Sequence, residues 1–269
     1  MYKSLAFTVA MLTAVPAAAQ LQDRNSLTLG VGLGTIPSYE GSNNYRMIPA
    51  PLVRGRVAGF NFNTVRTHLY FDAWRDGPGK LDVQIGPVIG ANLNRTARIG
   101  DARVRALGTL DIAVEGGGFV GLSRTGLATP FDSLSFVVSY QQDLTDVHDS
   151  HIIRPQITYT RPLDLKTAVR FGVGAEIVGA GYARTYFGVT PAGAGASGLP
   201  EYRLGGGLKD VNLSAGVTRA LSGTLLKGWS AFGAVGASRV LGDFADSPVV
   251  RLAGEENTFF GSVGLAYSF

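Results

Sequence analysis

Apolar and polar residues alternate one by one along most of this 269-residue chain, and no other feature of the sequence constrains the fold as strongly. In the closing stretch ENTFFGSVGLAYSF, every second residue from Phe259 to Phe269 is apolar or glycine, and the residues between are small and mostly polar. Successive side chains of a β-strand point to opposite faces. The stretch therefore predicts a strand with one apolar face and one small, mostly polar face.

The same period of two recurs along the chain and predicts an all-β protein. Single-chain bacterial barrels have an even number of strands, whereas the sequence shows eleven obvious ones. We therefore expect twelve strands, with ten as the alternative, and an additional short strand either in FNFNTV (residues 60–65) or within residues 178–190. The eleven segments are residues 26–36, 45–56, 62–73, 81–91, 108–122, 131–142, 150–161, 166–178, 208–220, 227–240 and 256–269.

Two architectures produce such alternation: a β-sandwich with a dry core, and a transmembrane β-barrel with its apolar side outward. The faces predicted to be polar carry mainly glycine, serine and threonine with few charges of both signs, which fits a narrow hydrated lumen better than a solvent face. Glycine contributes 37 residues, about twice its usual share, and a closed, sharply bent sheet tolerates glycine within strands. The sequence therefore predicts a transmembrane antiparallel β-barrel.

The N-terminus has the layout of a secretory signal, with Lys3, an apolar run from Leu5 to Val15 and small residues up to Ala19. We expect a signal peptide at residues 1–19 and one barrel domain at residues 20–269. No later stretch has 18 consecutive apolar residues, so membrane helices are not expected. The absence of cysteine excludes disulfides and thiol chemistry, and a formal charge of +4 is far from the basic patch of a nucleic-acid-binding protein.

Short and long connections are expected to alternate between the two ends of the barrel. Turns are predicted at residues 75–80, 123–130, 161–166 and 221–228, and longer polar connections near residues 92–107, 143–149, 178–207 and 240–255. Outer-membrane barrels have short periplasmic turns and longer external loops. We therefore expect the long connections on the outside of the membrane.

One polar cluster is a candidate for chemistry. The stretch DLTDVHDSH places Asp143, Asp146, His148, Asp149 and His151 in one predicted loop, where histidine beside carboxylate could bind a divalent metal or activate water. Its spacing does not match a helical two-histidine zinc site, and we expect an ordinary polar surface loop. The chain also lacks a G-x-S-x-G motif. We therefore predict no catalytic, cofactor-binding or metal-binding residues, no cofactor and no enzyme activity.

Charged residues on the predicted inner faces decide between a filled lumen and a pore. Ten or twelve strands enclose a narrow lumen at most, because wide aqueous channels need about sixteen. We expect opposite charges across the lumen to pair and block it, and His68 to form hydrogen bonds in this interior. The alternatives are a narrow pore and, less favoured, an outer-membrane hydrolase. The predicted inner wall contains Arg66, Asp72, Asp82, Asp111, Glu115, Arg154, Arg170 and Glu176.

Several sequence blocks, in this order along the chain, resemble the MipA/OmpV family of outer-membrane proteins. The blocks are PSYEGSNNYRMIPAP (37–51), YFGVT (186–190), SGLPEYRLGGGLKDV (197–211), LGDFADSPVV (241–250) and the ending GLAYSF. The terminal Phe269, two residues after Tyr267, resembles the signal by which barrel proteins are recognised by the outer-membrane assembly machinery. Within the blocks, residues such as Pro37, Gly41 and Pro248 are expected to fix turn geometry.

The resemblance implies a barrel in the outer membrane of a Gram-negative cell, surrounded by outer-membrane lipid. One member of the family is described as a scaffold that links a murein-cleaving lytic transglycosylase to a murein-synthesising penicillin-binding protein. The resemblance therefore implies a non-catalytic scaffold or structural protein linked to peptidoglycan turnover, without nucleic acid as a partner.

Overall fold

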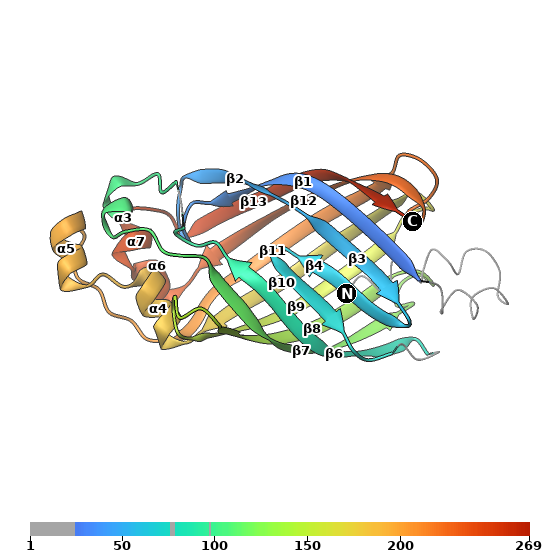
Figure 1. The fold of residues 1–269 in the computed structure, drawn as a ribbon, viewed down its shortest axis with the longest axis horizontal. Helices are drawn as coiled ribbons and strands as arrows, with labels where there is room; N and C mark the ends of the chain where they lie inside the picture. The colour runs from blue at the N-terminus through green and yellow to red at the C-terminus, as the bar shows by residue number, and fades with distance from the viewer. Residues whose placement is uncertain (1–24, 76–78, 97) are drawn as a thin grey trace.

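The chain forms one closed antiparallel β-barrel with short helices gathered at one end (Figure 1). The computed structural model describes residues 25–75, 79–96 and 98–269, so the predicted signal peptide lies outside the described residues. From β3 to β13 each strand pairs with the next one in the chain, and β1 pairs with both β2 and β3. β13 pairs with β1 to close the barrel, with Val31 opposite Leu265. The helices define the loop end, and the C-terminus lies at the other end, the turn end (Figure 1).

The strands are β1 (Ser26–Pro37), β2 (Tyr45–Pro49), β3 (Leu52–Val57), β4 (Phe60–Val65), β5 (His68–Asp72), β6 (Leu81–Asn92), β7 (Ala113–Thr125), β8 (Ser133–Asp143), β9 (His151–Pro162), β10 (Thr167–Val178), β11 (Gly207–Ala220), β12 (Gly228–Val240) and β13 (Asn257–Ser268). The helices are α3 (Ala102–Ala106), α4 (Ala180–Phe187), α5 (Pro191–Ser197), α6 (Gly242–Asp246) and α7 (Pro248–Arg251).

The barrel has twelve strands around its circumference, as expected. The thirteen strand segments reduce to twelve because β2 and β3 pair with two successive parts of β1 and form one interrupted strand. FNFNTV is the additional strand β4, and the predicted strand 62–73 is divided into β4 and β5 by a turn at Arg66, whose φ is 54°.

Two details of the strand prediction are wrong. Residues 178–190 contain α4 instead of a strand, because Tyr182, Ala183, Tyr186 and Phe187 repeat at helical spacing and are buried together. Residues 108–112 precede β7 and are not part of a strand, since the chain here leaves α3 and enters the barrel only at Ala113.

The outer and inner faces follow the predicted alternation. On β13, Phe259, Val263 and Leu265 are exposed on the outside, whereas Thr258 and Ala266 are buried inside. The other long strands repeat this arrangement, so an apolar band surrounds the barrel. Such a band, with every strand paired in a closed ring, is the form in which β-structure crosses a bilayer. Among the described residues, no helix is long and apolar enough to cross a membrane.

One side of the wall is lower than the rest. The strands β4 and β5 have 6 and 5 residues, whereas β1 and β6 have 12 each. Above the tip of this hairpin, β2 pairs only with β1 among the described strands. Arg46 of β2 bridges the opening by donating hydrogen bonds to the backbone oxygen of Leu93 and to Oγ1 of Thr96.

The predicted short turns connect strands at the turn end. In the turn between β7 and β8, Asp132 accepts hydrogen bonds from the amides of Leu127, Ala128 and Thr129, and from the hydroxyl of Tyr159. Burial alone would raise the pKa of Asp132, but the hydrogen bonds from Tyr159 and the amides outweigh it and lower this pKa. The carboxylate therefore stays charged and holds the turn closed.

Gly86 of β6 lies where two strands approach too closely for any larger residue. An added Cβ would sit 1.9 Å from the backbone oxygen of Phe71 and 3.0 Å from the backbone nitrogen of Ala73. We expect Gly86→Ala to lower the free energy of unfolding by about 1–3 kcal/mol, because backbone has to move. Urea unfolding of the barrel in detergent measures this loss. Gly195→Ala in α5 is the control, since nothing beyond its chain neighbours and the backbone of its own helix lies within 4 Å of the added Cβ. Equal midpoints for both variants would contradict the assignment.

Candidate functional site

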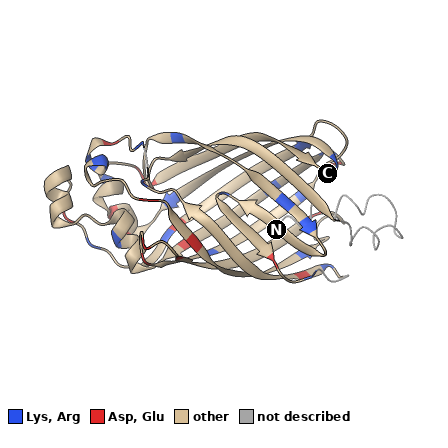
Figure 2. Cartoon of the chain, in the orientation of Figure 1, with Lys and Arg blue, Asp and Glu red and all other residues tan. Residues whose placement is uncertain are grey.

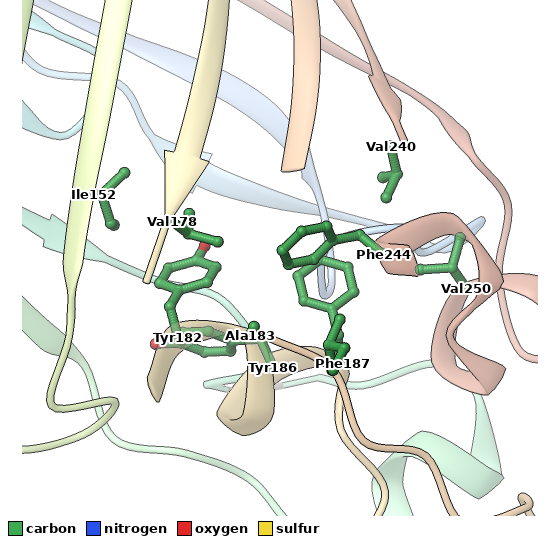
Figure 3. Close-up of a cluster of buried hydrophobic side chains, with 10 residues drawn as sticks. Ile152, Val178, Tyr182, Ala183, Tyr186, Phe187, Val240, Phe244 and Val250 are labelled. Carbon is green, nitrogen blue, oxygen red and sulfur yellow. The ribbon is translucent and has the colours of Figure 1, made fainter. Parts of the chain in front are cut away.

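The loop end of the barrel is closed by a packed cap. Tyr182 and Phe187 of α4 are fully buried, and the ring of Phe187 lies edge-on to that of Phe244, with 5.1 Å between centroids. Figure 3 shows these rings packed together between α4, the barrel wall and α6–α7. The buried cluster consists of Ile152, Val178, Tyr182, Ala183, Tyr186, Phe187, Leu204, Val240, Phe244 and Val250.

A second apolar cluster joins the remaining long connections to this cap. It brings together residues from the segment after β1, from α3, from the segments around α5 and from α7. Side-chain caps hold the short helices: Asp101 begins α3, Thr190 begins α5 and Ser247 begins α7, each accepting a backbone N–H of its helix. The members are Tyr39, Ile99, Val104, Val189, Leu199, Val249 and Ala253.

Beneath the cap, a network of charged side chains crosses the lumen, and Glu115 of β7 is its first centre. The Glu115 side chain is fully buried. It accepts hydrogen bonds from Nε2 of His68 at 3.1 Å, from Nδ2 of Asn92 at 2.9 Å and from Nη2 of Arg154 at 3.1 Å. Nε2 of His148 lies 3.5 Å from Oε1 of Glu115. Three different strands and one long loop thus converge on a single carboxylate.

Arg154 of β9 connects this centre to a second one. Its Nη1 donates to Oε1 of Gln141 at 2.6 Å, and its Nε donates to Oε1 of Glu176 at 3.2 Å. Oε1 of Glu176 in β10 also accepts a hydrogen bond from Nη1 of Arg66, at 3.4 Å. Because β6 to β9 separate β5 from β10, Arg66 reaches Glu176 across the lumen and not along the wall.

Lys209 of β11 attaches the cap to the network. Its Nζ lies 2.6 Å from Oε1 of Glu40, 2.7 Å from Oε2 of Glu176 and 3.2 Å from Oδ2 of Asp210. The hydroxyl of Tyr182 in α4 donates to Glu40 at 2.7 Å. Burial raises the pKa of Tyr182 well above its ordinary value, so this hydroxyl keeps the proton that it donates.

The network is nearly balanced in charge, which allows it to stay buried. An unpaired charge in a protein interior is costly, whereas a paired and fully hydrogen-bonded one is tolerated. The buried Lys209 and Glu115 each have several partners of opposite charge or hydrogen-bonding groups. The four carboxylates are Glu40, Glu115, Glu176 and Asp210, the three cations are Arg66, Arg154 and Lys209, and the two histidines beside Glu115 are His68 and His148.

Most of the predicted inner-wall charges lie inside the barrel, and their pairing is confirmed for four of them. Arg66, Glu115, Arg154 and Glu176 form the network described above, and His68 has the predicted hydrogen-bonding role. Asp111 is wrongly assigned, because it precedes β7 and is exposed. Asp72 is buried nearer the turn end, where it accepts the amides of Trp74 and Ile85.

The stretch DLTDVHDSH is not an ordinary polar surface loop. His148 is buried, and its ring packs against those of Tyr182 and Tyr186 at 5.0 and 5.8 Å between centroids. Asp143 folds the segment back by accepting the amides of Thr145, His148 and Asp149. In the described part of the chain, no group of three His, Cys, Asp or Glu residues is placed to hold a metal.

Sequence reasoning missed Glu40, Tyr182, Lys209 and Asp210. Glu40 and Lys209 lie within blocks that carry the family resemblance, PSYEGSNNYRMIPAP and SGLPEYRLGGGLKDV, so the blocks mark the junction of cap and barrel. Lys209 was obscured by the run of glycines before it, which breaks the alternation. Tyr182 was hidden because its segment was considered as a strand.

Two small cavities lie among the side chains of the interior. One cavity of about 30 Å³ lies beside Tyr70, Gln84, Phe119 and Arg154, and another of about 40 Å³ lies near the turn end beside Arg54 and Leu225. A water molecule needs roughly 10–15 Å³ of such space, so each cavity holds about two or three waters. At the level of the network and the cap, side chains occupy the interior.

Comparison with solved structures identifies outer-membrane proteins of low similarity. An outer-membrane channel from Pseudomonas putida has 12% identity and a TM-score of 0.44, with 91% of this chain and 95% of that chain covered. The CymD monoaromatic hydrocarbon channel has 13% identity, a TM-score of 0.41 and coverages of 93% and 91%. For the anion-selective porin from Comamonas acidovorans, identity is 12%, the TM-score is 0.36, and the alignment covers 82% of this chain and 60% of the porin.

A comparison with curated protein sequences found no match. The family model described as "MltA-interacting protein MipA", in contrast, matches residues 29–269, from the first strand to the last residue. The matched range contains the barrel except for the first three residues of β1, together with the cap and the charged network beneath it. The chain therefore belongs to the MipA family and forms an outer-membrane β-barrel.

Proposed function

We propose that this protein is a non-catalytic outer-membrane scaffold that holds murein-turnover enzymes at the membrane. The observation that carries the proposal is the closed loop end: the charged network crosses the lumen and the apolar cap packs above it. A barrel that is closed at one end offers its outer surfaces as the place of function. The family model is described by an interaction with MltA, which supports a lytic transglycosylase as one partner. A penicillin-binding protein, implied only by the family resemblance, is the second partner that we propose.

The turn end is the surface that we assign to these partners. Barrels of the outer membrane place their short turns in the periplasm, where murein lies. The tips of the turns between β9 and β10 and between β11 and β12 expose Leu163, Leu165 and Leu221, which are 43–61% exposed. Exposed apolar side chains at turn tips are suited to contact with a protein. Barrel assembly in turn would rely on Phe269, which is exposed beside β1.

The scaffold proposal predicts direct binding through the turns. We expect the wild-type protein to crosslink in intact cells to a lytic transglycosylase, and replacement of Leu163, Leu165 and Leu221 by serine to reduce this crosslinking by about tenfold. Val235→Ser, on the lipid-facing band and 63% exposed, is the control for the loss of an exposed apolar side chain. Crosslinking that identifies no murein enzyme in wild-type cells would overturn the proposal.

Conductance distinguishes the scaffold from the alternative of a narrow pore. Purified protein in a planar bilayer should give no reproducible conductance steps, because the network and the cap close the loop end of the lumen. Regular steps whose size changes on neutralising Glu115 or Arg154 would instead establish a pore. His148→Ala should likewise leave the scaffold phenotype intact, since no catalytic role is assigned to this residue.

A further inference from the structure

The turn end carries an excess of exposed positive charge. Figure 2 shows basic segments of the ribbon near the end at which the C-terminus lies. Among the described acidic residues of this end, only Asp164 is exposed. The exposed basic residues here are Arg75, Lys80, Arg124, Arg161, Lys166, Arg219 and Lys227. We propose that three of them, Arg124, Arg161 and Arg219, form a binding belt for anionic phospholipid headgroups in the membrane leaflet around the turn end.

The three arginines occupy equivalent positions in the barrel. Each is the second-to-last residue of a strand that runs toward the turn end: Arg124 in β7, Arg161 in β9 and Arg219 in β11. The residue next to each arginine in the chain is buried inside the barrel. These neighbours are Ser123, Thr160 and Ala220. Because strand side chains alternate, the arginines point outward.

The surface directly above the arginines is apolar. Two positions earlier on the same outward faces lie Leu122, Tyr159 and Val217, of which Leu122 is 49% and Val217 is 46% exposed. Two residues of a strand span about 7 Å. A guanidinium on its long apolar stem therefore lies at the edge of the hydrocarbon region and extends to the phosphates beside it.

Aromatic residues indicate that the three arginines lie at the height of the membrane interface. Trp74 is 58% and Trp229 is 51% exposed, and both lie at the turn end. Trp229 packs on Tyr267, which packs on Phe269, with centroid distances of 5.2 and 4.9 Å. Tryptophan and tyrosine prefer the depth of the headgroups, so the arginines beside them share that depth.

Within the described residues, no carboxylate lies at ion-pair distance from these arginines. Arg219 donates instead to Oγ1 of Thr167 at 2.8 Å, and its electrostatic interaction with Asp164 is longer in range. Arg239 provides the contrast, because it is the second-to-last residue of β12 at the opposite end and pairs with Glu256 at 2.9 Å. At the turn end, a phosphate headgroup, to which arginine can donate two parallel hydrogen bonds, supplies the close ionic partner that the protein does not.

Their position on the wall favours lipid over an acidic soluble protein. A periplasmic protein would approach the turn tips, where Lys166 and Lys227 lie. Arg124, Arg161 and Arg219 instead leave the side of the barrel, next to residues that acyl chains cover. This inference concerns the side of the barrel and does not depend on the scaffold role of the turns.

The two tryptophans make the proposal testable by fluorescence, because Trp74 and Trp229 are the only ones in the chain and both lie at the belt. The full protein is reconstituted into phosphatidylcholine vesicles containing 20 mol% of a lipid with brominated acyl chains, either phosphatidylglycerol or phosphatidylcholine. Each cation near an anionic surface strengthens binding by about fivefold. In the wild type, we expect brominated phosphatidylglycerol to quench the tryptophan fluorescence about twice as strongly as brominated phosphatidylcholine. In the triple variant R124Q/R161Q/R219Q, we expect the two lipids to quench about equally.

Arg239→Gln is the matched control, because it removes an outward arginine from the equivalent strand position at the other end. It should retain the wild-type preference, and anomalous gel migration of unheated samples verifies that every variant is folded. Equal quenching by both lipids in the wild type would overturn the proposal, as would a preference that survives in the triple variant. It would also be overturned if the triple variant lost an acidic protein partner while its lipid preference stayed unchanged.

Discussion

Glu115→Gln lowers the free energy of unfolding by about 3–5 kcal/mol, which is the largest effect expected of any single substitution in the wall. Glutamine has nearly the shape of glutamate, so the loss arises from charge and hydrogen bonding and not from a cavity. Arg154 and His68 each donate to this carboxylate, and the amide of Asn92 donates to it as well. The variant leaves Arg154 buried with one carboxylate, Glu176, and its new NH₂ group faces donors instead of acceptors.

Equilibrium urea unfolding in detergent, followed by the intrinsic tryptophan fluorescence, measures this loss. Glu256→Gln is the control, because it breaks an ion pair on the surface. In this pair, the side chain of Arg239 is 58% exposed and that of Glu256 is 46% exposed. An exposed ion pair contributes about 0–1 kcal/mol, so this variant should remain close to the wild type. Similar losses of unfolding free energy for both variants would contradict the claim that the buried network stabilises the protein more than an exposed ion pair does.

Phe187→Ala is expected to loosen the cap while leaving the barrel intact. Phe187 is fully buried and contacts Phe244, so its removal leaves a cavity in the larger apolar cluster. Truncation of a buried phenylalanine costs about 3–5 kcal/mol. Because the cluster joins α4 to α6 and α7, the loss falls on the cap, which contains no complete strand of the barrel.

Hydrogen exchange detected by mass spectrometry resolves the location of this effect. Amides of α4, α6 and α7 should exchange faster in Phe187→Ala, whereas those of β7 and β8 should keep their wild-type protection. Leu252→Ala removes an apolar side chain of the same cap that is 46% exposed, and its exchange should change little. Uniform loss of protection over the whole barrel would contradict an independent cap.

The barrel was predictable from the sequence because strands have a short, local period. Leu29, Val31 and Leu33 alternate with small residues and lie outside, as the pattern indicates. The short hairpin was harder to resolve: β4 and β5 together occupy about the length of one ordinary strand, and only the rule of even strand numbers indicated a missing one.

The cap and the complete network were beyond this kind of prediction. His148 and Tyr182 lie in long connections whose packing depends on contacts between distant segments, such as Tyr182 with Glu40, which are 142 positions apart. No local period records such contacts. The sequence could predict that charges such as Glu115 and Arg154 find partners, since charges on the inner faces of a narrow barrel need them. Which residues pair depends on the register of all the strands, and this register is not visible in the sequence.

The low side of the wall at β4 and β5 has a consequence for the bilayer itself. Five or six residues of a strand span about 17–20 Å, roughly half the length of the 12-residue strands beside them. The polar bridge from Arg46 to Leu93 and Thr96 lies above this hairpin, at a height where the other strands still present apolar side chains. Lipid beside the hairpin therefore meets a shorter apolar surface, and the membrane is expected to be locally thinner on this one side of the protein.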